Sequence, residues 1–227
     1  MITVHRPQHQ EPPPRWHFFP TIDNTVTNPY GVSDEAIGLV RRKPIGERLA
    51  SIYVRQPVDG ADYNGDCLPI SAILNSTSPQ VTAMRNEQNY IEKKRKEDNL
   101  PIFTPYCVLR YDFRFRAYYP VNYTCLLDFD IRHEDNPSID LDELKKELSA
   151  LPQIAYCGLA TNRIDLFCLV PISAPKRHTD HARALLGLFR KQGVIIRIDD
   201  YPLHTRTLCS DPSGYFNPNA EEFTRMM

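Results

Sequence analysis

The chain has 227 residues, of which 41% are hydrophobic and 24% are charged, and its formal net charge at pH 7 is −1. This length is enough for one sizeable domain with a hydrophobic core, and the charge balance excludes a globally basic nucleic-acid-binding protein while allowing a local basic face. No apolar run approaches membrane-spanning length, so we expect no membrane association. The six scattered cysteines form no closely spaced pair, which predicts free thiols in a reducing cytoplasm and argues against a zinc site.

The first 20 residues differ in composition from the rest of the chain. Prolines in residues 1–20 predict an extended, flexible arm, and the aromatic side chains near its end suggest that part of it docks on a surface. We expect residues 21–227 to form a single domain, with an N-terminal part (21–120) and a core (121–227).

The N-terminal part is expected to mix helices and strands. Ser33 is well placed to cap a short helix that ends near Leu39, and residues 51–54 favour a strand. Residues 78–98 favour one long helix with a lysine-rich C-terminal end. Because lysines interact favourably with the dipole at that end, we interpret this run as a solvated helix terminus.

Arginines alternate with aromatic residues just before the most apolar strand. In an extended segment, Arg110, Arg114 and Arg116 share one face. The opposite face is aromatic and consists of Tyr111, Phe113 and Phe115. Arginine binds phosphate through its planar fork and aromatic rings stack on bases, so the three arginines are candidate nucleic-acid ligands. The alternative is a hairpin whose aromatic face packs in the core and whose arginines face water.

An apolar strand at residues 125–130 ends in two alternating aspartates. Asp128 and Asp130 project from one face, and Leu127 and Phe129 project from the other. Two carboxylates at this spacing are suited to hold a hard divalent cation such as Mg²⁺. The alternative is that both aspartates merely solvate the end of the strand.

The elements that follow this strand favour the metal site. A helix, two strands, a second helix and a third strand are expected at residues 141–151, 153–160, 166–172, 179–193 and 194–198. The resulting α+β order, β-α-β-β-α-β, is that of ferredoxin-like and RNA-recognition folds, so we expect one antiparallel sheet with both helices on one face. In that topology Asp199, or the adjacent Asp200, can join Asp128 and Asp130 in one site.

Three segments carry a family resemblance, namely residues 100–104, 122–130 and 211–220. The last segment is the most specific, because relatives have a similar run ending in Asn-Pro-Asn-Ala after an arginine, which here is Arg206. From about residue 51 onward, the chain resembles the VirE N-terminal-type domain. That domain is a branch of the archaeo-eukaryotic primase (primase-polymerase) superfamily and is found with replication and mobile-element genes.

The resemblance implies an RNA-recognition-like catalytic core that performs metal-dependent nucleotidyl transfer. Asp128 and Asp130 would form the first acidic motif and Asp199 the third, and together they would hold Mg²⁺ or Mn²⁺ as catalytic and metal-binding residues. Arg206 would steady the phosphates of a nucleoside triphosphate.

The chain departs from this family at the second motif, between the two paired strands. Residues 160–167 contain none of the glycine, histidine or lysine residues that relatives carry there. Glycines matter in such a loop because a backbone that cradles phosphate must approach it closely. Arg163 is the residue of this stretch that can offer positive charge to a nucleotide phosphate.

We therefore expect a primase-polymerase-like domain that acts on nucleic acid, with DNA favoured over RNA, in the replication or maintenance of a mobile element or phage. The expected partners are a nucleoside triphosphate and a helicase or another replication protein. Two alternatives stay open. One is a catalytically degenerate nucleic-acid-binding or protein-docking module on the same fold, and the other is a metal-dependent nuclease.

Overall fold

The computed structural model describes residues 31–53, 66–76, 78–112, 117–199, 204–208 and 211–227. Within these residues the chain forms an α+β fold with three antiparallel sheets, which confirms the fold class expected from the sequence. The predicted proline-rich arm lies outside the described residues. None of the helices in the described part is long and apolar enough to span a membrane.

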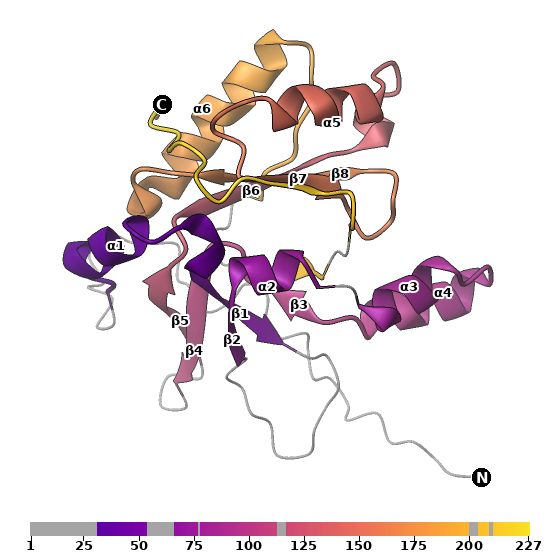
Figure 1. Cartoon of the computed structure of the whole chain (residues 1–227), viewed down its shortest axis with the longest axis horizontal. Helices are drawn as coiled ribbons and strands as arrows, with labels where there is room; N and C mark the ends of the chain where they lie inside the picture. The colour runs from indigo at the N-terminus through magenta and orange to yellow at the C-terminus, as the bar shows by residue number, and fades with distance from the viewer. Residues whose placement is uncertain (1–30, 54–65, 77, 113–116, 200–203, 209–210) are drawn as a thin grey trace.

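The first sheet has the strand order β2-β1-β3-β9 and lies in the lower half of Figure 1. Its strands are β1 (Leu49–Tyr53), β2 (Asp66–Pro69), β3 (Ile102–Phe103) and β9 (Arg206–Thr207), each antiparallel to its neighbour. Strand β1 confirms the strand expected near residues 51–54. Because β9 comes from the C-terminal part of the chain, this sheet joins the two predicted parts of the domain.

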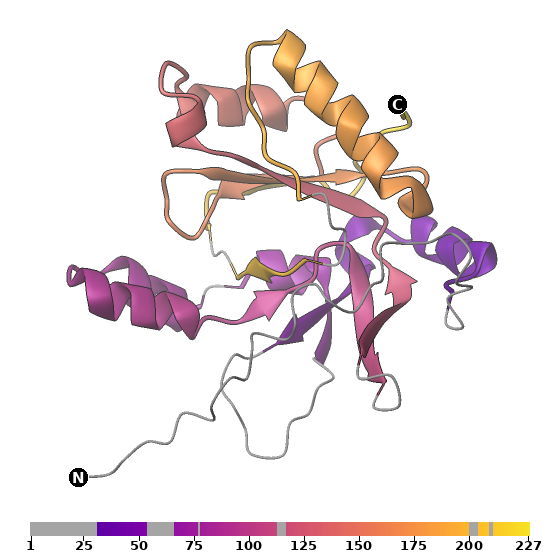
Figure 2. The ribbon, with the colours of Figure 1, turned by 180° about the vertical axis from the view of Figure 1, so that it is seen from behind.

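Short helices accompany the first sheet. The 3₁₀ turn η1 (Ile45–Glu47) and helix α2 (Ile70–Leu74) pack with β1 and β3 in one buried apolar cluster. The single long helix predicted over residues 78–98 is wrong, because the chain forms α3 (Pro79–Arg85) and α4 (Tyr90–Asp98) instead. Asn89 starts the second helix by accepting hydrogen bonds from the amides of its first turn. Figures 1 and 2 show the two helices side by side, projecting from the body of the molecule.

The third sheet is a hairpin of β4 (Cys107–Asp112) and β5 (Ala117–Tyr123). It lies beside α1 (Asp34–Arg41), whose N-terminus is capped as predicted by Ser33, since its Oγ accepts from the Ala36 amide at 3.1 Å. The described ends of the arginine- and aromatic-rich segment, residues 110–112 and 117–119, are therefore paired as antiparallel strands.

The second sheet has the order β10-β7-β8-β6 and carries both helices of the predicted core. Its strands are β6 (Leu126–Ile131), β7 (Tyr156–Leu159), β8 (Leu166–Pro171) and β10 (Tyr215–Phe216). Helices α5 (Leu141–Ser149) and α6 (His178–Lys191) lie on the same face of this sheet, as expected (Figure 1). Leu151, the last residue of the helix expected at residues 141–151, follows the end of α5 and is 45% exposed.

The prediction of a strand over residues 194–198 is wrong, because this segment does not form a full strand. A single antiparallel bridge joins this segment to β6: the Asp130 amide donates to the Arg197 carbonyl at 2.9 Å, and the Arg197 amide donates to the Asp130 carbonyl at 2.8 Å. A longer ladder does not form because the side chain of Asn136 takes both backbone groups of Ile195, accepting from its amide at 2.8 Å and donating to its carbonyl at 2.9 Å. The segment therefore still lies beside β6 at Asp130.

Candidate functional site

Strand β6 separates its apolar side chains from its acidic ones, as its alternation predicts. Leu127 and Phe129 belong to the apolar cluster shared with α5 and α6, whereas Leu126 belongs to the cluster of the first sheet. Asp128 and Asp130 share the face of Leu126 and therefore project toward the first sheet. The side chain of Asp128 is completely buried, and that of Asp130 is 16% exposed.

Arg206 of β9 pairs with both carboxylates from the opposite sheet. Its Nε donates to Asp128 Oδ2, and its Nη1 donates to Asp130 Oδ2. His204 Nε2 lies 2.9 Å from Asp128 Oδ2 and donates to it, because an ionised carboxylate only accepts. The ring of Phe167 lies 5.8 Å from Arg206 Cζ. One guanidinium group thus links the two predicted metal ligands and joins the two sheets.

The charges in this cluster shift each other's pKa values. Burial alone would raise the pKa of Asp128, but the nearby His204 and Arg206 outweigh burial and hold that pKa well below its ordinary value. For Asp130 burial dominates, and its pKa is raised although Arg206 acts in the opposite direction. Burial would lower the pKa of Arg206, yet the two carboxylates raise it. Asp128 and Arg206 therefore form a charged pair at neutral pH.

An open cleft of about 480 Å³ borders this cluster. Asp130 and Arg206 line it, together with Glu97 from the end of α4, Arg132 after β6, and Asp165 from the β7–β8 turn. The cleft is large enough for a nucleotide-sized ligand, and its walls carry charges of both signs.

Asp199, the third predicted metal ligand, is exposed and follows the segment bridged to β6. The structure brings Asp128 and Asp130 together with Arg206. Across the described residues, however, no group of three or more His, Cys, Asp or Glu side chains is arranged to hold a metal ion. The neighbouring Asp200 lies outside the described residues.

Of the remaining predicted arginines, the two that the structure describes, Arg110 and Arg163, do not line the cleft. Arg163 is in the β7–β8 turn with a φ of +66° and lines a separate pocket. Arg110 is exposed on β4. Arg114 and Arg116 lie outside the described residues. The two predicted phosphate ligands, Arg163 and Arg206, thus face different pockets.

The segment with the most specific resemblance, residues 211–220, completes the second sheet. Its strand β10 pairs with β7, and Asp211 accepts from the Leu159 amide at 2.6 Å. The Ile45 amide donates to the Pro218 carbonyl at 3.1 Å, which ties the segment to the N-terminal part of the domain. These contacts give the segment a structural function at the sheet edge.

Two contributors are not among the site residues predicted from the sequence. His204 lies against Asp128, and Arg85 of α3 lines the same pocket as Arg163. The two-residue spacing of His204 and Arg206 is the available signal for the first, because such a spacing puts both side chains on one face of an extended segment. No local signal links Arg85 to the β7–β8 turn.

Comparison with known proteins assigns no family, because no family model, curated protein or solved structure matches the chain. A candidate function therefore depends on the geometry of the site and on the motif resemblance.

Proposed function

We propose that this chain is a primase-polymerase-like domain that binds nucleic acid, with DNA favoured over RNA, in the replication or maintenance of a mobile element or phage. In this proposal β6, α5, β7, β8 and α6 are the RNA-recognition or ferredoxin-like core, and residues 194–198 are a reduced final strand. The antiparallel order β7-β8-β6, the bridge to the edge of β6 and the two helices on one face support it. A helicase or another replication protein is the proposed partner.

The mode of action that the geometry favours is binding without catalysis. The pairing of Arg206 with both Asp128 and Asp130 carries this conclusion. A divalent cation needs carboxylate oxygens as ligands, and here Oδ2 of each aspartate already accepts a hydrogen bond from the guanidinium group. The arginine supplies the positive charge that a metal ion would supply. This pairing and the missing second motif both favour a catalytically degenerate module. In such a module the aspartates of β6 link the second sheet to the first through Arg206.

Metal-dependent nucleotidyl transfer is the second candidate, and one observation favours it. Asp128 Oδ1 is buried and has no hydrogen-bond partner among the described residues, which is unusual for an ionised carboxylate. The aspartates are suitable ligands for Mg²⁺ or Mn²⁺ once Arg206 releases them, with Asp199 or Asp200 as a third. A bound ion would stabilise charge on a transferred phosphoryl group. Arg206 would then face a nucleoside triphosphate in the cleft.

Addition of Mn²⁺ distinguishes these two candidates. We expect it to leave the Tm of the wild-type protein unchanged, with or without a nucleoside triphosphate, because Arg206 holds both aspartates. Differential scanning fluorimetry measures the shift, and the Asp128→Ala/Asp130→Ala double variant is the control. A rise in the Tm of the wild type that the double variant abolishes would support the metal-dependent candidate instead.

Nucleic-acid binding is tested at the β4–β5 hairpin. Arg110→Glu is expected to weaken single-stranded DNA binding several-fold and to reduce the slope of log affinity against log salt by about one, because a phosphate contact is lost. Fluorescence anisotropy at several salt concentrations measures both quantities. Arg183→Glu, at an exposed position of α6, is the matched control. Equal affinities for the two variants would exclude the hairpin as the interface.

A further inference from the structure

Two cysteines face each other on neighbouring strands of the second sheet. Cys157 of β7 pairs in register with Cys168 of β8, and their sulfur atoms lie 3.5 Å apart. Both side chains are completely buried, in the apolar cluster that the sheet shares with α5 and α6. A sulfur–sulfur bond is about 2.0 Å long, so small rotations of the two side chains are enough to bring these atoms within bonding distance.

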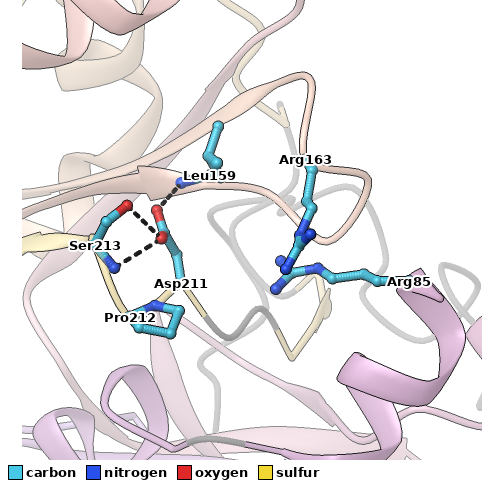
Figure 3. A pocket seen from close by; sticks show the side chains of 6 residues that line it. All are labelled: Arg85, Leu159, Arg163, Asp211, Pro212 and Ser213. Atoms are coloured by element: carbon cyan, nitrogen blue, oxygen red, sulfur yellow. Dashed lines mark hydrogen bonds between the residues drawn. The ribbon is translucent and has the colours of Figure 1, made fainter.

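The hydrogen bonds of β7 show which kind of pair the two cysteines form. Hydrogen-bonded and non-hydrogen-bonded pairs alternate along two antiparallel strands. The Leu159 amide points away from β8 and donates to Asp211, as Figure 3 shows, so Leu159 and Leu166 are a non-hydrogen-bonded pair. Two positions earlier in β7, Cys157 and Cys168 are another such pair. The Cα atoms of these pairs are only about 4.5 Å apart, which lies within the range of about 4.4–6.8 Å that a disulfide spans.

Burial decides which oxidants can act on these thiols. It raises the pKa of the Cys168 thiol well above its ordinary value, so this group stays protonated at neutral pH and reacts slowly. A bulky reagent does not fit among the apolar side chains of the cluster, whereas a small uncharged peroxide does. The pair is therefore protected against adventitious oxidation and is suited to hydrogen peroxide.

We propose that Cys157 and Cys168 form a reversible cross-strand disulfide when the protein is exposed to hydrogen peroxide. The thiolate of one cysteine attacks a peroxide oxygen, so that a sulfur–oxygen bond forms, the oxygen–oxygen bond breaks, and a sulfenic acid and a hydroxide result. The second thiol then attacks the sulfenic sulfur. The disulfide bond forms, the sulfur–oxygen bond breaks, and water leaves with the proton of the second thiol. Two thiols and one peroxide thus become one disulfide and two water molecules.

The disulfide joins the two strands from which one wall of the cleft projects. Residues 160–165 connect β7 to β8, and Thr161, Asn162 and Ile164 of this turn line the cleft. A covalent link at the base of the turn stabilises the fold, because it restricts the unfolded chain. The short Cα separation strains the link and makes it easier to reduce, which is typical of regulatory rather than structural disulfides. This inference does not depend on the proposed function.

Peptide mapping of the full chain tests the link directly. Trypsin cleaves after Lys146, Arg163 and Lys176, so the two cysteines fall in different peptides, 147–163 and 164–176. After peroxide treatment and denaturation in iodoacetamide, we expect these peptides to be recovered as one species, two hydrogens lighter than their sum, which dithiothreitol separates. Recovery of the two cysteines as alkylated thiols, as sulfinic or sulfonic acids, or joined to other cysteines would overturn the proposal.

Thermal unfolding measures what the link does to the fold. Peroxide should raise the Tm of the wild type by about 5 °C, and dithiothreitol should reverse the rise. Cys157→Ala and Cys168→Ala should each abolish it, and comparing the treated and untreated forms of one variant cancels any cost of the substitution itself. Cys67→Ala, at an exposed position of β2, is the matched control and should keep the full rise. A rise that persists in Cys168→Ala would mean that other cysteines cause it and that the proposal is wrong.

Discussion

Replacement of Arg206 by leucine is expected to lower the free energy of unfolding by about 3–5 kcal/mol, the usual cost of removing one partner from a buried ion pair. Asp128 is completely buried, and after the substitution it would keep the contact with His204 but lose the guanidinium charge. Asp130 is itself only 16% exposed, so two poorly hydrated carboxylates would be left close together. Urea denaturation monitored by circular dichroism measures the difference.

Two comparisons keep this result specific. Arg183→Leu, at an exposed position of α6, should change stability by no more than about 0.5 kcal/mol. The deficit of Arg206→Leu should shrink toward acidic pH, because the unpaired carboxylates can then take up protons. If Arg206→Leu is as stable as Arg183→Leu, the arginine does not hold the two sheets together.

Local pattern in the sequence is enough to predict the acidic face of the site. Asp128 and Asp130 share one face of β6 because strand side chains alternate with a period of two. Ser33 predicts the start of α1 because its hydroxyl can cap a helix. The break between α3 and α4 is also encoded locally, in Asn86 and Asn89, but the continuous run of polar residues across them conceals it.

Long-range pairing is what local pattern does not reveal. Arg206 contacts Asp128 across two sheets: Arg206 is on β9, which pairs with β3 in the first sheet, and Asp128 is on β6 in the second sheet. Residues 194–198 have the alternation of a strand, and Val194 and Ile196 are indeed buried. This alternation predicts which side chains face the core. It does not reveal that the side chain of Asn136, from another loop, hydrogen-bonds to the backbone of Ile195 between them.

His178 is a second buried polar group whose behaviour depends on tertiary structure. This first residue of α6 is 3% exposed, and its ring lies edge-on against Tyr106 with 4.8 Å between the ring centroids. Neither ring nitrogen has a hydrogen-bond partner among the described residues. A neutral imidazole tolerates such a site better than a charged one does.

Charged neighbours also shift the pKa of His178, but the buried ring still prefers its neutral form. Burial is the main effect and lowers the pKa of His178 from 6.5 to about 4. Asp128 and Asp199 act to raise that pKa, whereas His204 and His181 lower it further. Because the folded-state pKa is lower than the unfolded-state one, the folded protein binds fewer protons between these values. The resulting stability is fully present above about pH 6.5 and is lost as the pH falls toward 4.

The wild-type protein should therefore lose about 3 kcal/mol of stability through His178 alone as the pH falls through this window, since each unit of pKa difference corresponds to about 1.4 kcal/mol. His178→Phe keeps a ring against Tyr106 but cannot bind a proton, so its unfolding free energy should decline by that much less. His181, whose pKa is also lowered by burial, is present in both proteins and cancels in the comparison. Urea denaturation at several pH values between about 4 and 7 measures the two profiles. Parallel profiles would mean that His178 is not held neutral in the fold.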